Sequence, residues 1–74
     1  MNNLIKKQMI DALEKKYEAQ IAEAKTTLMI YFKNPVGIGE HPQHLEEMDK
    51  LIEKMSAAQD KLNNLKDLFS NKVL

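Results

Sequence analysis

Apolar side chains recur at steps of three or four residues through the first half of the chain. They are Ile5, Met9, Leu13, Tyr17, Ile21, Ala24, Leu28 and Phe32. This spacing places them along one side of an α-helix. Asn34 should end that helix, because a residue that precedes proline is disfavoured in the α region. The pattern therefore predicts a helix over about 3–33.

The second half of the chain repeats the pattern. Its apolar stripe, which includes one glutamine, consists of Leu45, Met48, Ile52, Met55, Gln59, Leu62, Leu65 and Phe69. The steps alternate between three and four from Leu45 to Leu62, as they do along the seam of a coiled coil. Pro42 suits the first helical turn, where its missing N–H is not needed. A second helix is predicted over about 42–70.

One segment of the first half also fits a strand. Residues 26–32 read Thr-Thr-Leu-Met-Ile-Tyr-Phe, which is rich in β-branched and aromatic side chains. A lone strand needs a pairing partner, however, and no second strand-like stretch exists in the chain. The helix is therefore favoured, with a strand or an irregular helix end as the alternative.

Both glycines and both prolines fall within residues 34–43. A short breaker-rich connection between two helices makes them antiparallel neighbours, so the sequence predicts an all-α hairpin, a single domain over 1–74. The two stripes then pair in layers, from Phe32 with Leu45 to Ile5 with Phe69. Within the loop, Val36 and Ile38 are expected to turn inward and cover the ends of the aromatic side chains at 31 and 32.

A hairpin of two helices cannot bury all of this apolar surface, because each helix covers only one side of the other. The residues expected to meet a second copy or another protein are Met9, Ile10, Leu28, Met29, Ile30, Tyr31, Leu51, Ala58 and Leu65. A homodimer that forms a four-helix bundle is the simplest solution.

Two polar-tipped residues, Tyr17 and Gln59, fall at the same depth on the two inner stripes. A single polar layer resists slippage of an apolar seam, since a shifted register leaves its hydrogen-bonding groups against hydrocarbon. The sequence thus predicts that Tyr17 and Gln59 set the register. The alternative is that Gln59 points to solvent at the edge of the seam.

Charge and composition narrow the function. Eleven basic residues, all lysine, balance eleven acidic ones, and there is no cysteine. A nucleic-acid partner is not expected, because such proteins carry a basic surplus. Thiol chemistry and thiolate metal sites are excluded. No stretch reads as a signal peptide or a membrane span, so we expect neither a membrane partner nor export, and a cytoplasmic protein.

Metal binding is the one candidate chemistry. Glu40, His41, His44 and Glu47 gather oxygen and nitrogen ligands at the loop, and His44 and Glu47 share a helix face. The ordinary alternative is a solvated, polar helix start. We find no arrangement of serine, histidine and carboxylates that predicts catalysis, and no cofactor is expected.

The loop and second helix also resemble known sequences. Residues 34–42 read Asn-Pro-Val-Gly-Ile-Gly-Glu-His-Pro, and 45–54 read Leu-Glu-Glu-Met-Asp-Lys-Leu-Ile-Glu-Lys. Over about 30–68 the chain is similar to small uncharacterised proteins of tailed, T-even-like bacteriophages and marine viral samples. The resemblance implies a viral or environmental origin, with the host cytoplasm as its location, and brings no activity with it.

These observations favour a non-enzymatic protein, an oligomeric helical module for interaction or structure, with a phage accessory role suggested by the resemblance. The competing hypothesis is a metal-dependent activity, or a metal-stabilised assembly, that uses His41, His44 and Glu47.

Overall fold

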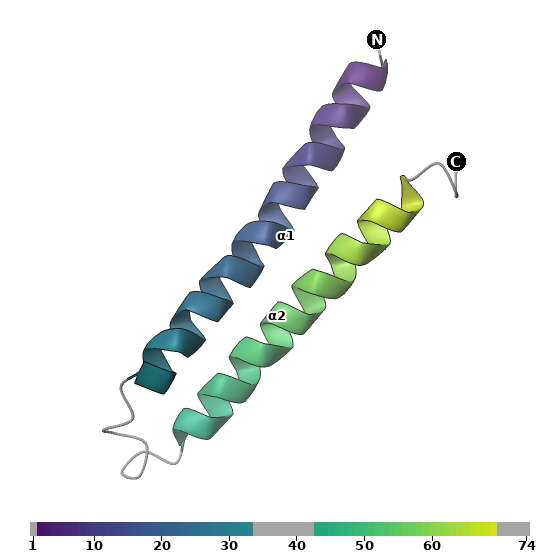
Figure 1. The fold of residues 1–74 in the computed structure, drawn as a ribbon. Coiled ribbons are helices and arrows are strands. Elements are labelled where there is room, and N and C mark those ends of the chain that lie inside the picture. Colours follow the sequence, from purple (N-terminus) through teal and green to yellow (C-terminus); the bar gives the residue numbers. More distant parts are fainter. Residues whose placement is uncertain (1, 34–42, 70–74) are drawn as a thin grey trace.

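The computed structural model describes residues 2–33 and 43–69 as two helices, α1 (Asn2–Lys33) and α2 (Gln43–Leu68). The helices lie side by side and run in opposite directions, with the start of α1 near the end of α2 (Figure 1). The prediction of an all-α hairpin is confirmed, and segment 26–32 is helical. The loop residues Val36 and Ile38 lie outside the described residues, so their predicted packing stays a prediction.

Side-chain contacts across the hairpin give the register of the two helices. They join Tyr31 to His44, Glu23 to Lys54, Tyr17 to Lys61 and Lys6 to Phe69. As the residue numbers fall along α1 they rise along α2, as antiparallel pairing requires. The register agrees closely with the layers predicted from the sequence.

The core is one narrow seam between the helices. Its buried apolar residues are Ala24, Leu28, Met48, Ala58, Leu62 and Leu65. The half-buried residues that continue the same rows are Ile10, Glu14, Tyr17, Ile21, Tyr31, His44, Leu51 and Met55. On each helix these positions alternate in steps of three and four, so the seam has the heptad spacing of a coiled coil.

Two alanines of the seam lie opposite large side chains. The register places Ala24 at the level of Leu51 and Ala58 at the level of Tyr17, and the two alanines are 0% and 2% exposed. A small residue facing a large one lets the backbones stay close while the layer remains filled. This alternation determines which row of each helix turns inward.

The seam differs from the predicted stripes by about one residue position at several layers. Several residues predicted to pack inward are largely exposed instead: Ile5 at 58%, Leu13 at 40%, Phe32 at 64%, Leu45 at 67% and Ile52 at 50%. One partner helix covers only the seam positions of the other, so where two apolar rows are adjacent one of them stays outside.

The predicted outer surface needs the matching correction. Three of its residues, Leu28, Ala58 and Leu65, are buried within the hairpin, because they belong to the seam. Three others, Ile10, Tyr31 and Leu51, are half-buried along the same rows. The remaining three, Met9, Met29 and Ile30, are exposed.

Truncating a seam residue should therefore destabilise the hairpin far more than truncating an exposed leucine. Leu62→Ala removes a side chain that is 5% exposed and should cost about 2–3 kcal/mol of the free energy of unfolding. Leu4→Ala, at a position that is 64% exposed, should cost less than about 0.5 kcal/mol. Urea unfolding followed by circular dichroism at one protein concentration measures both values. Equal losses would contradict the assignment of the seam.

Candidate interaction surfaces

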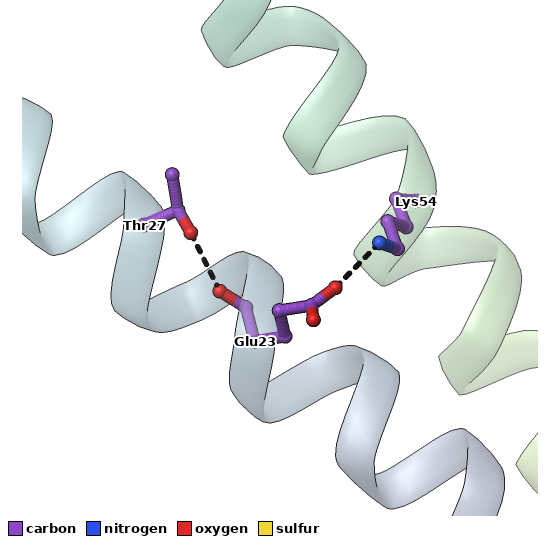
Figure 2. Close-up of polar contacts among 3 residues, drawn as sticks. All are labelled: Glu23, Thr27 and Lys54. Carbon is purple, nitrogen blue, oxygen red and sulfur yellow. Dashed lines mark hydrogen bonds and ion pairs between the residues drawn. The ribbon is translucent and has the colours of Figure 1, made fainter.

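One flank of the hairpin is bridged by charged side chains, and we call it the bridged flank: Lys6, Glu23, Lys54 and Lys61. Lys54 Nζ donates to Glu23 Oε1 over 2.7 Å, from α2 to α1 (Figure 2). Lys61 lies with its ammonium 5.9 Å from the centre of the Tyr17 ring, and Lys6 reaches within 5.3 Å of the Phe69 ring. These contacts close this side of the seam with lysine side chains.

The hydroxyl of Thr27 is used within α1. Thr27 Oγ1 donates to the backbone carbonyl of Glu23 over 2.9 Å, one helical turn away (Figure 2). The carboxylate of Glu23 points in the other direction, toward α2. Glu23 thus takes part in one contact within its own helix and one between helices.

Lysine at 54 changes the acidity of its partner. The hydrogen bond from Lys54, and then its positive charge, lower the pKa of the Glu23 carboxyl below its usual value. A carboxyl whose pKa is lower in the folded state adds stability above its unfolded pKa, and that contribution is lost as the pH falls through the folded value. The ion pair therefore favours the folded hairpin at neutral pH and not in acid.

The opposite flank carries apolar side chains instead, and we call it the open flank: Met29, Phe32, Leu45, Ile52 and the groove described below. Phe32 and Leu45 directly follow Tyr31 and His44, whose rings pack on each other with centroids 5.4 Å apart. In an antiparallel pair, residues that follow facing seam residues emerge on the same side. Ile52 lies two turns beyond Leu45 on that side.

A groove continues the open flank toward the middle of the hairpin. Its lining residues are Ile21, Met55, Ser56, Gln59, Asp60 and Asn63. Ile21 and Met55 are half-buried members of the seam, whereas Gln59 is exposed at the rim and donates through Nε2 to Asn63 Oδ1 over 3.0 Å. The apolar floor of the groove is thus the edge of the core itself.

This placement corrects the predicted register pair. Gln59 lies on the open flank and bonds within α2, while Tyr17 lies at the level of Ala58 with Lys61 beside its ring. The alternative reading of Gln59 as an edge residue is confirmed for the hairpin. The seam residues of the described helices include one carboxylate, Glu14, which is half-buried at the level of Leu62. The sequence offered no signal for it, because Glu14 falls between apolar positions of the predicted stripe.

The end of α1 near the termini carries a second apolar row. Ile5, Met9 and Leu13 follow one another at steps of four and are 40–63% exposed; we call this row the terminal stripe. A second groove on α1 is lined by Leu4, Lys7, Gln8, Ile10, Asp11 and Glu14, and it lies on the side of the open flank, not of this stripe. Four of these six residues are charged or amide side chains, and the groove beside Ile21 and Met55 is lined by four polar residues as well.

Two of the predicted metal ligands lie in the described residues, and each has another contact. His44 packs against Tyr31, and Glu47 Oε1 lies 4.0 Å from Lys50 Nζ. His41 and Glu40 lie outside the described residues. Within residues 2–33 and 43–69, no group of three or more histidine and carboxylate side chains is close enough to hold a metal ion.

Comparison with known proteins adds no assignment: no family model, no curated protein and no solved structure matches this chain significantly. In the part of the chain that the structure describes, neither helix holds an apolar stretch long enough to cross a membrane. The surfaces above are therefore the basis for a functional hypothesis.

The Glu23–Lys54 pair predicts a specific acid response. Glu23→Gln should lower the melting temperature of the hairpin at pH 7 and have a smaller effect at pH 3, because the ion pair contributes only while the carboxyl is ionised. Thermal unfolding of the two proteins at several pH values measures the difference. Glu53→Gln removes an exposed carboxylate of α2 and serves as the control. A gap between wild type and Glu23→Gln that widens in acid would contradict the assignment.

The position of Glu14 on the seam predicts that an apolar substitution there increases stability. Glu14→Leu should raise the free energy of unfolding by about 1 kcal/mol, because it replaces a half-buried charge on the seam with an apolar side chain at the level of Leu62. Glu53→Leu, on an exposed face, should change it by less than about 0.5 kcal/mol. Denaturant unfolding checks both, and a loss of stability in Glu14→Leu would show that this carboxylate is needed in the seam.

Proposed function

We propose that the chain is a non-enzymatic, self-associating helical hairpin whose function is structural or lies in binding other proteins. The single observation that supports this most strongly is the amount of surface that the hairpin leaves exposed. The chain exposes 6060 Å², whereas a compact monomer of this mass exposes roughly 4,700 Å². The excess, about 1,400 Å², is larger than the roughly 800 Å² that each partner buries in a standard interface.

The shape and the distribution of apolar residues support the same proposal. The molecule measures 56 × 19 × 15 Å, and its radius of gyration is 16.9 Å, against roughly 11 Å for a compact domain of this length. Eleven large apolar side chains are at least 39% exposed. An elongated hairpin with so few buried residues is stabilised when another helical surface covers those side chains.

The resemblance of the loop and α2 to small proteins of tailed bacteriophages fits an accessory role of such an assembly in the host cytoplasm. The grooves are shallow and lie along the helix surfaces, and they carry amide and carboxylate side chains without a nearby histidine or hydroxyl pair that would act as base and nucleophile. The proposal therefore assigns the protein no catalytic residues, metal or cofactor.

Self-association predicts a concentration-dependent mass and stability. Sedimentation equilibrium of the 74-residue chain at micromolar concentration should give a species of at least twice the 8.5 kDa chain mass. The melting temperature should rise with protein concentration, because binding to the folded state stabilises it by mass action. Zinc or manganese should leave both values unchanged. A folded monomer with a constant melting temperature would refute the proposal, and a mass that depends on metal would favour the metal-stabilised assembly.

A further inference from the structure

Building on the proposed self-association, we propose that a second copy of the chain covers the open flank. The two hairpins meet open flank to open flank, related by a two-fold axis that runs parallel to the helices. The ends of the two hairpins that carry Lys33 and Gln43 then lie together, and α1 of one copy packs beside α2 of the other. The result is a closed four-helix bundle.

The open flank suits this contact because its apolar surface comes from both helices and joins the core. Met29 and Phe32 of α1 are 49% and 64% exposed, and Leu45 and Ile52 of α2 are 67% and 50% exposed. The groove next to them has the half-buried side chain of Met55 in its floor. A helix laid along this flank would extend the existing seam rather than start a separate core.

The bridged flank is less suited to a two-fold contact, because it carries three lysines beside the exposed Leu13 and Leu68, which lie on the rows of Lys6 and Lys61. Lys6, Lys54 and Lys61 lie along it, and two of these lysines already lie over aromatic rings of the other helix. Two-fold pairing through this flank would bring the lysines of both copies together. Juxtaposed like charges, and the removal of ammonium groups from water, oppose such an interface.

Charge also favours the orientation in which both loops lie at one end. Most apolar side chains of the open flank lie in the half near Phe32 and Leu45, where the same row of α1 also carries Lys25. Toward the termini the same flank carries Asp11 on α1 and Lys66 on α2, seven-residue repeats of the positions of Phe32 and Leu45. With parallel hairpins, Asp11 of each copy lies beside Lys66 of the other and Phe32 lies beside Leu45, while the stem of Lys25 lies along Ile52. If the two hairpins pointed in opposite directions, the half of each flank near Phe32 and Leu45 would face Asp11 and Lys66 of the other copy.

Substitutions on the two apolar surfaces test which one is used. Ile52→Lys places a charge on the open flank, and Ile5→Lys makes the same change on the terminal stripe at a similarly exposed site, 58% against 50%. Sedimentation equilibrium should show the dimer dissociation constant raised about a hundredfold or more by Ile52→Lys, since the interface contains the substitution twice. Ile5→Lys should change it less than about threefold. Circular dichroism at matched concentration shows whether each variant is helical.

The relative orientation of the two hairpins can be tested with a label placed outside the proposed interface. The chain has no cysteine, so Lys33→Cys carries one nitroxide label at the exposed end of α1. Pulsed electron resonance should give a distance between the two copies below about 35 Å, because packed helices lie about 8–10 Å apart. Opposed hairpins would place the labels at a separation close to the 56 Å length of the molecule.

The outcomes separate this inference from the broader proposal. A wild-type chain that stays monomeric would refute self-association itself. Three other results would leave self-association intact and overturn the assignment of the open flank. They are an oligomer that persists in Ile52→Lys, an oligomer that dissociates in Ile5→Lys, and labels at position 33 that are about 50 Å apart or more.

Discussion

The structure depends on one narrow seam between two helices. A single partner helix covers two positions of every seven on the helix it faces, and the flanking positions are covered only in part. Within the described residues this leaves six buried apolar side chains, two of them alanine. Other features follow from this limit: the elongated shape, the exposed leucines and isoleucines, and the lysines that bridge one edge. Stability and surface chemistry are therefore coupled, because an apolar residue next to a seam position is exposed and becomes part of the surface.

The helical periodicity and the hairpin topology could be predicted from the sequence. Which rows of residues turn inward to form the seam could not. Steps of three and four, together with the breakers at 34–43, are sufficient for an antiparallel hairpin in nearly the right register. At the loop end, however, Tyr31 and Phe32 are adjacent aromatic residues, and His44 and Leu45 offer a similar choice on α2. Hydrophobicity alone favours Phe32 with Leu45. The structure instead pairs Tyr31 with His44, whose rings are tilted by 55° to each other.

Alanine explains part of that choice. Ala24 and Ala58 lie on the rows that turn inward and allow close approach of the backbones, while bulky Leu51 and Tyr17 fill the opposite positions. An analysis that considers the hydrophobicity of each side chain separately undervalues small residues. Their contribution comes from the close approach of the partner helix that they allow. For the same reason Glu14 escapes notice: it lies on the inner row because its neighbours one turn away do, and not because of its own chemistry. The prediction of the outer surfaces was therefore wrong for the same reason as the prediction of the seam.

The unequal flanks bear on how such a hairpin can assemble without aggregating. If both flanks were apolar, each hairpin would offer two interfaces, and copies would add without limit into a sheet of helices. Lysines at 6, 54 and 61 make one flank unfavourable to a second copy, and the Glu23 contact holds one of them in place over the seam. In the proposed dimer, the open flank would pair once and the lysines of the bridged flank would face outward. The ion pair at Glu23 is worth little to stability as an exposed contact, so in that dimer its larger effect would be to hold Lys54 over the other edge of the seam.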